Sequence, residues 1–493
     1  MKLSTAIQYV SAEPSAQMDP ASLESEVGSF AIDSREVEAG ALFFALSQPE
    51  YKKNGFNGEF EDSTRYAASA LERGAVAAVV RRDRFEEHRE ELVAIEHKLI
   101  FAEDVIAAFQ RLAHGVYTEW NKPVVAITGS AGKTTAKELT AHVLEAGGKK
   151  VLKNIKNYNN GLGHPLTVLK LANDPSYDIG VLEMGMSTPL HEIERLCRIT
   201  PPDVAVVLNV LPVHIEHLGT IERIQQAKAE IVEGMKAGGF AVLNADDPLV
   251  AAMEPLSKGR TVTYGIESDA DVRATDIQFP RFGETRFALS HKGESAPVTF
   301  PLNGRHSIMN ALAASAVGLI YGMSTTAVAV ALSTVTAPPQ RGEVLRFANG
   351  FTVINDSYNS NPDALLSMVD TLVEGGTGAR RKIVVAGEML ELGDDELNIH
   401  RRTGETLGSK DIDILIGVRG LAAELVAAGK ASGLGDARFA EDSDAAANLV
   451  ADIVSDGDVV LVKGSRGVRT EKVIEKLLGR YKLEEEVSGA ATR

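Results

Sequence analysis

The sequence predicts an α/β protein of three domains, and three observations support this prediction. The chain has 493 residues, more than one hydrophobic core normally serves. From residue 124 onward, apolar strands alternate with helical segments, a pattern typical of parallel sheets covered on both faces. A Pro-Pro step within residues 337–340 separates two such series. We therefore expect an N-terminal α/β domain over 1–117, a central P-loop-type domain with a parallel sheet over 118–336, and a C-terminal Rossmann-like domain over 337–493.

The composition excludes several classes of protein. The formal net charge is −17, and broad nucleic-acid binding needs a basic field, so we expect no nucleic-acid partner. The chain contains no run of about 18 uncharged apolar residues, and its N-terminus lacks the basic-then-apolar order of a signal peptide. We therefore expect no membrane insertion. The single cysteine, Cys197, can form no internal disulfide, which fits a reducing cytoplasm.

Apolar runs and helical spacing mark the elements expected in each domain. In the first domain they predict strands at 41–46 and 75–80, with a helix at 63–73 between them. In the second they predict strands at 124–128, 179–182, 204–209, 240–243 and 262–264, helices at 137–144, 221–235 and 307–321, and a small antiparallel extension at 271–300. In the third they predict strands at 352–355, 382–386, 412–416 and 459–462, followed by a polar tail that frays after Leu483.

The most informative motif follows the strand at 124–128. A glycine-rich turn leads into a helix, and such a turn lets backbone N–H groups close around a phosphate. The full Walker A pattern would have a glycine where Ile127 stands, but the remainder matches. We expect Lys133 to reach the distal phosphates of a nucleoside triphosphate and Thr134 to hold Mg²⁺. The residues expected at the phosphates are Gly129, Ser130, Ala131, Gly132, Lys133, Thr134 and Thr135.

Further polar residues follow the predicted strands, where parallel sheets place functional groups. Glu183 ends one strand and suits Mg²⁺, a cation that prefers oxygen ligands. His214 and His217 follow another strand at a spacing that zinc ligands can have, but no further Cys/His cluster completes a zinc site. We therefore interpret His214 as support for a phosphate-bound Mg²⁺. Judged by its neighbours alone, Lys228 is interpreted as a helix-surface lysine.

Two more clusters have both a structural and a functional interpretation. Residues 157–167 are rich in asparagine and glycine, which suit turns, yet their amides could also hydrogen-bond a sugar or a peptide. Residues 463–469 place a lysine and two arginines among glycines just after the last strand. Such a cluster is typical of a carboxylate or phosphate site, although a basic helix start on the surface would have a similar sequence.

These clusters, in this order, resemble the Mur ligases, which are ATP-dependent amide-bond-forming enzymes of bacterial cell-wall synthesis. The resemblance extends over residues 32–478. It implies that the phosphate loop binds ATP and that Glu183 and His214 lie at the magnesium. It also places Lys228 at the lysine that is carbamylated in many members, which reverses the interpretation above, because a carbamate can support Mg²⁺. The resemblance adds three residues on the nucleotide side, which are Asn310, Arg341 and Asp356.

Within the family, the motifs resemble the branch that joins D-alanyl-D-alanine to UDP-N-acetylmuramoyl-tripeptide. The substrate residues implied are Ser34, Arg35 and Leu46 near the uridine end, Asn159 and Asn160 in the asparagine-rich turn, and Asn359, Asn361, Lys463, Ser465 and Arg466 near the dipeptide. Two places depart from the family pattern. Residues 48–65 contain Asn-Gly-Glu-Phe instead of Asp-Gly-His-Asp-Phe, and Ser307 stands where asparagine is usual.

The resemblance implies catalysis in two steps through an acyl phosphate, with Lys133, His214 and Lys228 as the catalytic residues. The expected partners are small-molecule substrates, the protein is expected to act as a monomer, and residues 337–340 are expected to be a hinge. Three alternatives stay open. They are another amide ligase of the same architecture, such as a different Mur ligase or a folylpolyglutamate synthase, a P-loop ATPase with another role, and an inactive binding scaffold.

Overall fold

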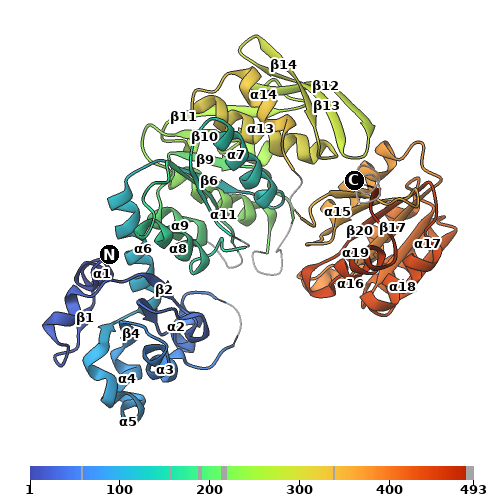
Figure 1. Cartoon of the computed structure of the whole chain (residues 1–493). Coiled ribbons are helices and arrows are strands. Elements are labelled where there is room, and N and C mark those ends of the chain that lie inside the picture. The colour runs from blue at the N-terminus through green and yellow to red at the C-terminus, as the bar shows by residue number, and fades with distance from the viewer. Residues whose placement is uncertain (57–58, 156, 187–190, 213–218, 337–338, 485–493) are drawn as a thin grey trace, which may run out of the picture.

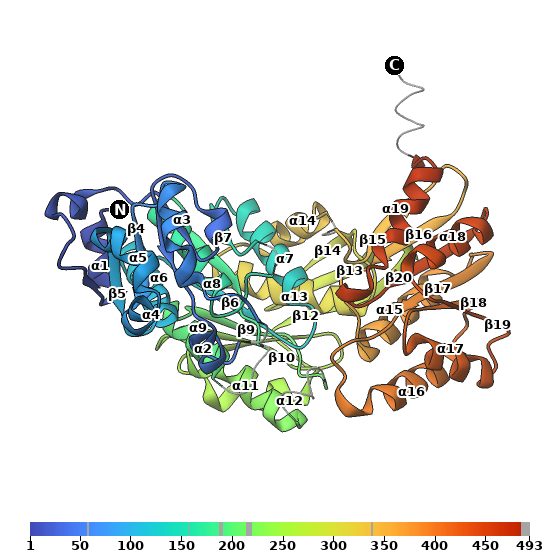
Figure 2. The ribbon, with the colours of Figure 1, turned by 90° about the horizontal axis from the view of Figure 1, so that it is seen from below.

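Three sheets, each with helices around it, make up the computed structural model of the chain (Figure 1). The structure describes residues 1–56, 59–155, 157–186, 191–212, 219–336 and 339–484. In both ribbon views the N-terminal and C-terminal sheets lie on opposite sides of the central one (Figures 1 and 2). This architecture confirms the predicted three-domain α/β class. Within the described ranges, no helix is both long enough and apolar enough to cross a membrane.

The N-terminal sheet has five strands in the order β1-β5-β4-β3-β2. Its strands are β1 (Glu13–Pro14), β2 (Ser29–Ala31), β3 (Ala41–Phe44), β4 (Ala77–Arg81) and β5 (Leu99–Ala102), with β1 antiparallel and the others parallel. The helices are α1 (Leu3–Val10), α2 (Gln48–Lys53), α3 (Ala67–Glu72), α4 (Arg82–Glu87) and α5 (Arg89–Leu92). Both predicted strands are present, and the predicted helix is divided into a 3₁₀ turn, Ser63–Tyr66, and α3.

Helix α6 (Val105–Trp120) connects the N-terminal sheet to the central sheet. Its apolar side chains belong to one continuous buried cluster that extends from Leu3 in the first sheet's helices to Met253 in the central part. The two parts of the molecule therefore share a hydrophobic core. The helix runs through residue 117, and a segment of residues 121–123 leads from its end into the central sheet.

The central sheet has nine strands in the order β14-β13-β12-β11-β10-β9-β6-β8-β7. The strands are β6 (Val124–Thr128), β7 (Val151–Lys153), β8 (Ile179–Glu183), β9 (Val204–Val207), β10 (Phe240–Asn244), β11 (Arg260–Gly265), β12 (Val272–Arg281), β13 (Glu284–His291) and β14 (Glu294–Phe300). The helices are α7 (Lys133–Ala146), α8 (Gly163–Val168), α9 (Glu192–Ile199), α11 (Ile221–Glu233), α12 (Pro248–Ala251), α13 (Arg305–Ile320) and α14 (Thr325–Ser333).

The predicted elements of the central part are present, with two differences. Helix α7 begins at Lys133 rather than at 137, because Gly132 takes φ +82° and turns the chain directly into the helix. The antiparallel extension is continuous with the main sheet, since β12 starts parallel to β11 before β13 and β14 turn back. The short strand β7 was not predicted. It pairs with β8 and forms the sheet edge nearest the asparagine-rich turn.

The C-terminal sheet has six strands in the order β15-β16-β20-β17-β18-β19. The strands are β15 (Glu343–Arg346), β16 (Thr352–Asp356), β17 (Arg381–Gly387), β18 (Ile414–Val418), β19 (Asp436–Ala440) and β20 (Asp458–Lys463), all parallel except β15. The helices are α15 (Pro362–Gly375), α16 (Glu396–Gly408), α17 (Ala422–Ala431), α18 (Ser443–Ile453) and α19 (Glu471–Arg480). The two edge strands, β15 and β19, were not predicted.

The central and C-terminal parts contact each other away from the linker. Phe282, at the turn between β12 and β13, is buried in the hydrophobic cluster of the C-terminal part. His306, on α13, lies 3.2 Å from the Ser367 hydroxyl of α15. Part of the predicted hinge, residues 337–338, and the last nine residues of the predicted tail lie outside the described residues.

Candidate active site

The phosphate loop connects the fully buried central strand β6 to α7, as the motif predicted. Gly132 precedes the helix, and a Cβ there would lie 2.6 Å from the side-chain oxygen of Asn310 on α13. Glycine is thus needed both for the left-handed backbone and for the close approach of Asn310. The loop is supported from β9, since Asn209 accepts a hydrogen bond from Ala131 N at 2.9 Å and donates one to Ala131 O at 3.2 Å.

Two side chains at the ends of the loop, Thr128 and Lys133, carry groups that suit an anion. Lys133 is half-buried, and its Nζ folds back to donate a hydrogen bond to the Gly129 carbonyl at 2.8 Å. Burial lowers the pKa of Lys133, while the negative charge of Glu183 opposes that shift. The Thr128 hydroxyl is buried and has no hydrogen-bond partner among the described residues. A cradle of glycines, backbone N–H groups and one lysine fits the phosphates of a nucleotide.

Glu183 ends β8 beside this loop, and its carboxylate is almost entirely buried. Its two oxygens have different partners. Oε2 accepts a hydrogen bond from the Thr134 hydroxyl at 2.9 Å, and Oε1 accepts one from Asn159 Nδ2 at 2.7 Å. The structure thus brings together three residues that the sequence placed at the site, from α7, β8 and the asparagine-rich turn.

Asn159 is held against Glu183 by the backbone of Gly185. The Gly185 N–H donates to Asn159 O at 2.8 Å, and a Cβ on Gly185 would lie 2.8 Å from the Asn159 side-chain carbon. Its neighbour Asn160 has a structural contact instead, because its Oδ1 accepts hydrogen bonds from Leu162 N and Gly163 N at the start of α8. Asn160 thus matches the turn-forming interpretation of this segment, whereas the adjacent Asn159 contacts the Glu183 carboxylate.

Lys228 lies on α11 and is only 2% exposed, so the interpretation as a surface lysine is wrong. Burial, together with the positive charge of Lys133, holds the pKa of Lys228 well below its ordinary value. Its amine is therefore biased toward the neutral form. His214, predicted to support the metal, lies outside the described residues, and so does His217.

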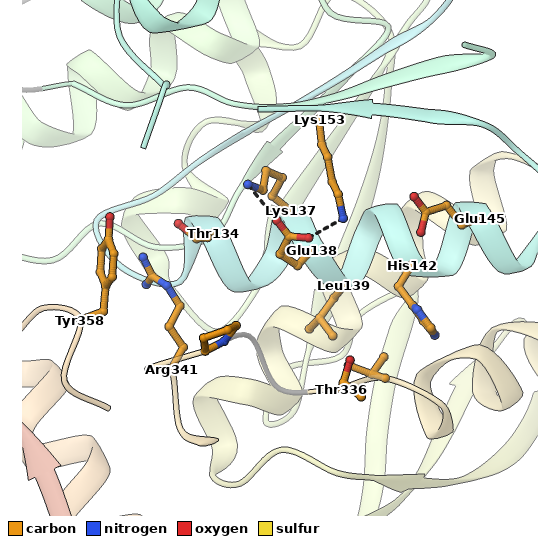
Figure 3. A pocket seen from close by; sticks show the side chains of 12 residues that line it. Thr134, Lys137, Glu138, Leu139, His142, Glu145, Lys153, Thr336, Arg341 and Tyr358 are labelled. Atoms are coloured by element: carbon orange, nitrogen blue, oxygen red, sulfur yellow. Dashed lines mark hydrogen bonds and ion pairs between the residues drawn. The ribbon is translucent and has the colours of Figure 1, made fainter. Parts of the chain in front are cut away.

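On the C-terminal side, a cavity of about 460 Å³ lies along α7 and reaches Thr134, where the phosphate loop passes into the helix (Figure 3). Arg341 and Tyr358 line the end of the cavity near Thr134, and the Arg341 guanidinium lies 4.1 Å from the centre of the Tyr358 ring. Arg466 lies 5.5 Å from the centre of the same ring. Tyr358, which the sequence did not single out, therefore contacts two of the predicted site residues by cation–π interactions.

Lys463, which is buried, and Asp356, which is half-buried, form an ion pair at the ends of β20 and β16. Their charged atoms are 2.5 Å apart, and Lys463 also donates to Asn359 O at 2.9 Å. Ser465 donates to Ser360 O at 3.3 Å and accepts from Leu390 N at 3.0 Å. The structure therefore places the two predicted clusters of the last domain beside each other.

The remaining predicted residues lie farther out or have other partners. Asn361 caps α15 by accepting a hydrogen bond from Ala364 N at 2.8 Å. In the N-terminal part, Ser34 and Arg35 form a 3₁₀ turn, where Arg35 is exposed and pairs with Asp33. Leu46 is buried just after β3.

The donors at the loop also fit Mg²⁺. Within the described ranges, no group of three or more His, Cys, Asp and Glu side chains converges, so a cage built entirely of protein ligands is not seen there. One carboxylate and one hydroxyl in contact, Glu183 and Thr134, are what Mg²⁺ uses when phosphates and water complete its shell. The arrangement can bind a nucleotide and a magnesium ion at one place.

Comparison with known proteins agrees with this fold and site. Family profiles match the Mur ligase middle domain over residues 127–318 and the Mur ligase, glutamate ligase domain over residues 340–466. The chain belongs to the Mur ligase family.

Individual relatives match almost the whole chain. UDP-N-acetylmuramoyl-tripeptide–D-alanyl-D-alanine ligase of Bacillus subtilis is 33% identical over 451 residues, which cover 91% of this chain and 92% of the relative. A crystal structure of MurF from Acinetobacter baumannii matches with a TM-score of 0.84 at 25% identity, covering 97% of this chain and 98% of the other. The structure of MurF ligase from Thermotoga maritima in complex with ADP matches with a TM-score of 0.77 at 28% identity, covering 93% and 98%.

Proposed function

We propose that this protein is an ATP-dependent ligase that joins D-alanyl-D-alanine to UDP-N-acetylmuramoyl-tripeptide. The observation that carries the proposal is the contact of Thr134, Glu183 and Asn159 beside Lys133, in a chain that matches relatives of that name over nine tenths of its length. The relatives support the choice of substrates, and the site geometry supports phosphoryl transfer as the chemistry.

In the first step, the tripeptide carboxylate attacks the γ-phosphorus of ATP, so an acyl phosphate forms and ADP leaves. Lys133, now held by the Gly129 carbonyl, turns its ammonium to the transferring phosphoryl group and stabilises the charge there. Thr134 and Glu183 are the residues that would hold Mg²⁺. When bound, that ion neutralises charge on the phosphates.

In the second step, the amine of D-alanyl-D-alanine attacks the acyl carbonyl, and inorganic phosphate leaves. We assign the dipeptide to the clusters of the last domain, where Lys463, Ser465, Arg466 and Asn359 gather. The Arg466 guanidinium there is always positively charged and can pair with the dipeptide carboxylate. No protein nucleophile is needed, so positioning of the reactants supplies most of the acceleration.

We also propose that Lys228 reacts with carbon dioxide to form a carbamate, with loss of one proton from the amine. Only the neutral amine can attack carbon dioxide, and the buried position of Lys228 favours that form. The product is negatively charged and resembles a carboxylate. It would turn a side chain that repels Mg²⁺ when protonated into one that supports the ion.

The other assignments remain proposals on the same basis. Asn310 takes the adenine side of ATP, and Arg341 and Asp356 lie near its phosphates and ribose. Ser34, Arg35 and Leu46 take the uridine end of the second substrate. We propose that the enzyme acts as a monomer in the cytoplasm, with His214 supporting the metal. The domain boundaries proposed are residues 117 and 336, with residues 337–340 as the hinge.

The test is phosphate release from ATP and Mg²⁺, with UDP-N-acetylmuramoyl-tripeptide and D-alanyl-D-alanine supplied together and singly. We expect release only when both are present, with the pentapeptide product formed in equal amount. Equal release with neither substrate would indicate an ATPase of another role. Release that needs a folate and glutamate instead would indicate a folylpolyglutamate synthase.

A further inference from the structure

A chain of buried polar contacts connects the phosphate-loop helix to the backbone of Glu183. Lys137, one turn after Lys133 on α7, is 1% exposed and donates from Nζ to the main-chain carbonyl of Asn154 at 2.8 Å. Asn154 directly follows β7 and is 2% exposed. Figure 3 shows Lys137 beside Glu138 on the wall of the cavity.

The Asn154 side chain completes the sheet where β7 is too short. Strand β7 ends at Lys153, so the edge of β8 at Glu183 lacks a ladder partner on that side. Asn154 Oδ1 accepts from Glu183 N at 2.8 Å, and Asn154 Nδ2 donates to Glu183 O at 3.0 Å. A side-chain amide carries the same donor and acceptor as a peptide group, so it replaces the missing strand.

The same amide also holds the asparagine-rich turn. Asn154 Nδ2 donates to Tyr158 O at 2.9 Å, one residue before Asn159, whose own amide donates to the Glu183 carboxylate. Asn154 thus fixes both the backbone of Glu183 and the segment that supplies one partner of its carboxylate. The remaining partner, Thr134, lies on the same helix as Lys137.

The charge of Lys137 is balanced locally, which lets it remain in this buried position. Its Nζ lies 2.9 Å from Glu138 Oε1, and the other Glu138 oxygen lies 2.6 Å from Lys153 Nζ. A buried ammonium with a carboxylate and a carbonyl as partners is a rigid donor, since losing either contact is costly. Lys137 is therefore suited to hold Asn154 in one place.

We propose that Asn154, held by Lys137, is a positioning residue that keeps the Glu183 carboxylate facing Thr134 and thereby sets the affinity for Mg²⁺ and nucleotide together. This inference rests on the proposed function, because it assumes that Glu183 and Thr134 face the metal. Neither Asn154 nor Lys137 touches the reacting atoms, and both act through Glu183. Partners of a metal ligand typically change metal affinity by about 10–100-fold when removed.

The test measures ADP affinity by calorimetry at rising Mg²⁺ concentration and in EDTA, so no turnover is involved. We define the Mg²⁺ midpoint as the concentration at which half of the Mg²⁺-dependent increase in ADP affinity is reached. For Asn154→Ala and Lys137→Met we expect this midpoint to rise about tenfold or more. Affinity in EDTA should stay within about twofold of the parent, since the phosphate loop is untouched. Asn154→Asp keeps the acceptor for Glu183 N but loses the donors, so it should shift the midpoint in the same direction.

Lys153→Ala is the matched control, because it removes the other partner of Glu138 and leaves the Asn154 contacts in place. We expect its Mg²⁺ midpoint to equal that of the parent. Unchanged midpoints in the Asn154 and Lys137 variants would overturn the inference. A parent protein that binds ADP equally with and without Mg²⁺ would overturn the proposed metal site itself.

Discussion

Two lysines of the site, Lys133 and Lys228, differ in what surrounds them. Burial lowers the pKa of Lys133, and the negative charge of Glu183 opposes that shift. Lys228 is almost fully buried, and the positive charge of Lys133 adds to the effect of burial, so the pKa of Lys228 is well below its ordinary value. The same amine group thus suits a charged contact to phosphate in one place and a neutral nucleophile in the other.

Replacing the lysine of the phosphate loop tests the first of these roles. We expect Lys133→Ala to lower phosphate release by about 10²–10³-fold or more, because a charge that stabilises the transferring group is lost. The circular dichroism spectrum should not change, since the hydrogen bonds that the structure describes for Lys133 go to carbonyls of its own loop. Near-normal turnover would show that the phosphate site is wrongly placed.

Replacing Lys228 tests the carbamate. We expect Lys228→Ala to lose activity, because neither the amine nor its carbamate is left to support the metal. Added bicarbonate should not restore it, whereas a short carboxylic acid such as acetate should restore part by occupying the space of the carbamate. Full activity in Lys228→Ala would contradict the carbamate proposal.

At the scale of elements, the site depends on how strands end and how α7 begins. Glu183, Asn209 and Asp356 all lie at or just after the carboxyl ends of parallel strands. The chain enters α7 through the left-handed backbone of Gly132, which points the helix N-terminus at the strand ends.

Two glycines at the two ends of α7 allow a controlled test. Gly132 and Gly148 share φ +82°, but a Cβ on Gly132 would meet Asn310 whereas one on Gly148 would meet open space. Both alanine variants should lose about 1 kcal/mol from backbone strain. We expect only Gly132→Ala to weaken ADP binding, by tenfold or more, as measured by calorimetry. Equal ADP affinities in the two variants would show that the contact with Asn310 has no role.

At the scale of the whole molecule, α6 connects the first two parts, and a buried glutamate secures its start. Glu50 is fully buried on α2, accepts a hydrogen bond from Ile106 N at 3.2 Å, and shares a hydrogen bond with Asp104. Burial and the neighbouring carboxyl of Asp104 raise the pKa of Glu50 to about 7. The folded chain therefore holds a proton here that the unfolded chain releases at lower pH.

This shift makes stability depend on pH with a definite sign. Because the folded state binds the proton more tightly, the free energy of unfolding falls as pH rises from about 4.5 through 7. Glu50→Gln keeps an acceptor but cannot ionise. Its free energy of unfolding, relative to that of the parent, should therefore rise by up to about 3 kcal/mol between pH 5 and 8. Urea unfolding at both pH values measures this.

The exposed Glu36 offers a control, since Glu36→Gln should follow the parent curve at every pH. Parallel pH curves for Glu50→Gln and the parent would contradict the assignment of the proton to this carboxyl pair. If Glu50→Gln changes the unfolding of the N-terminal and central parts more than that of the C-terminal part, the result would agree with the core that the first two parts share around α6.

What the sequence determined by itself is local. The phosphate loop could be predicted because a buried strand, a glycine turn and a helix start are consecutive in the chain, and Glu183 followed from its place at a strand end. The central strands could be predicted from apolar runs, but β7, β15 and β19 are short or carry charged residues, so their apolar pattern is weak.

Only the tertiary structure decided which polar residues are buried together. In the sequence, Lys228 and Lys137 cannot be distinguished from lysines on a helix surface, and only the packing of the fold buries both. Asn154 contacts Glu183 because β7 ends early. Tyr358 lines the cavity along α7 because the last domain lies against that helix. Burial and long-range contact depend on the whole fold, so neither can be predicted from a pattern of a few consecutive residues.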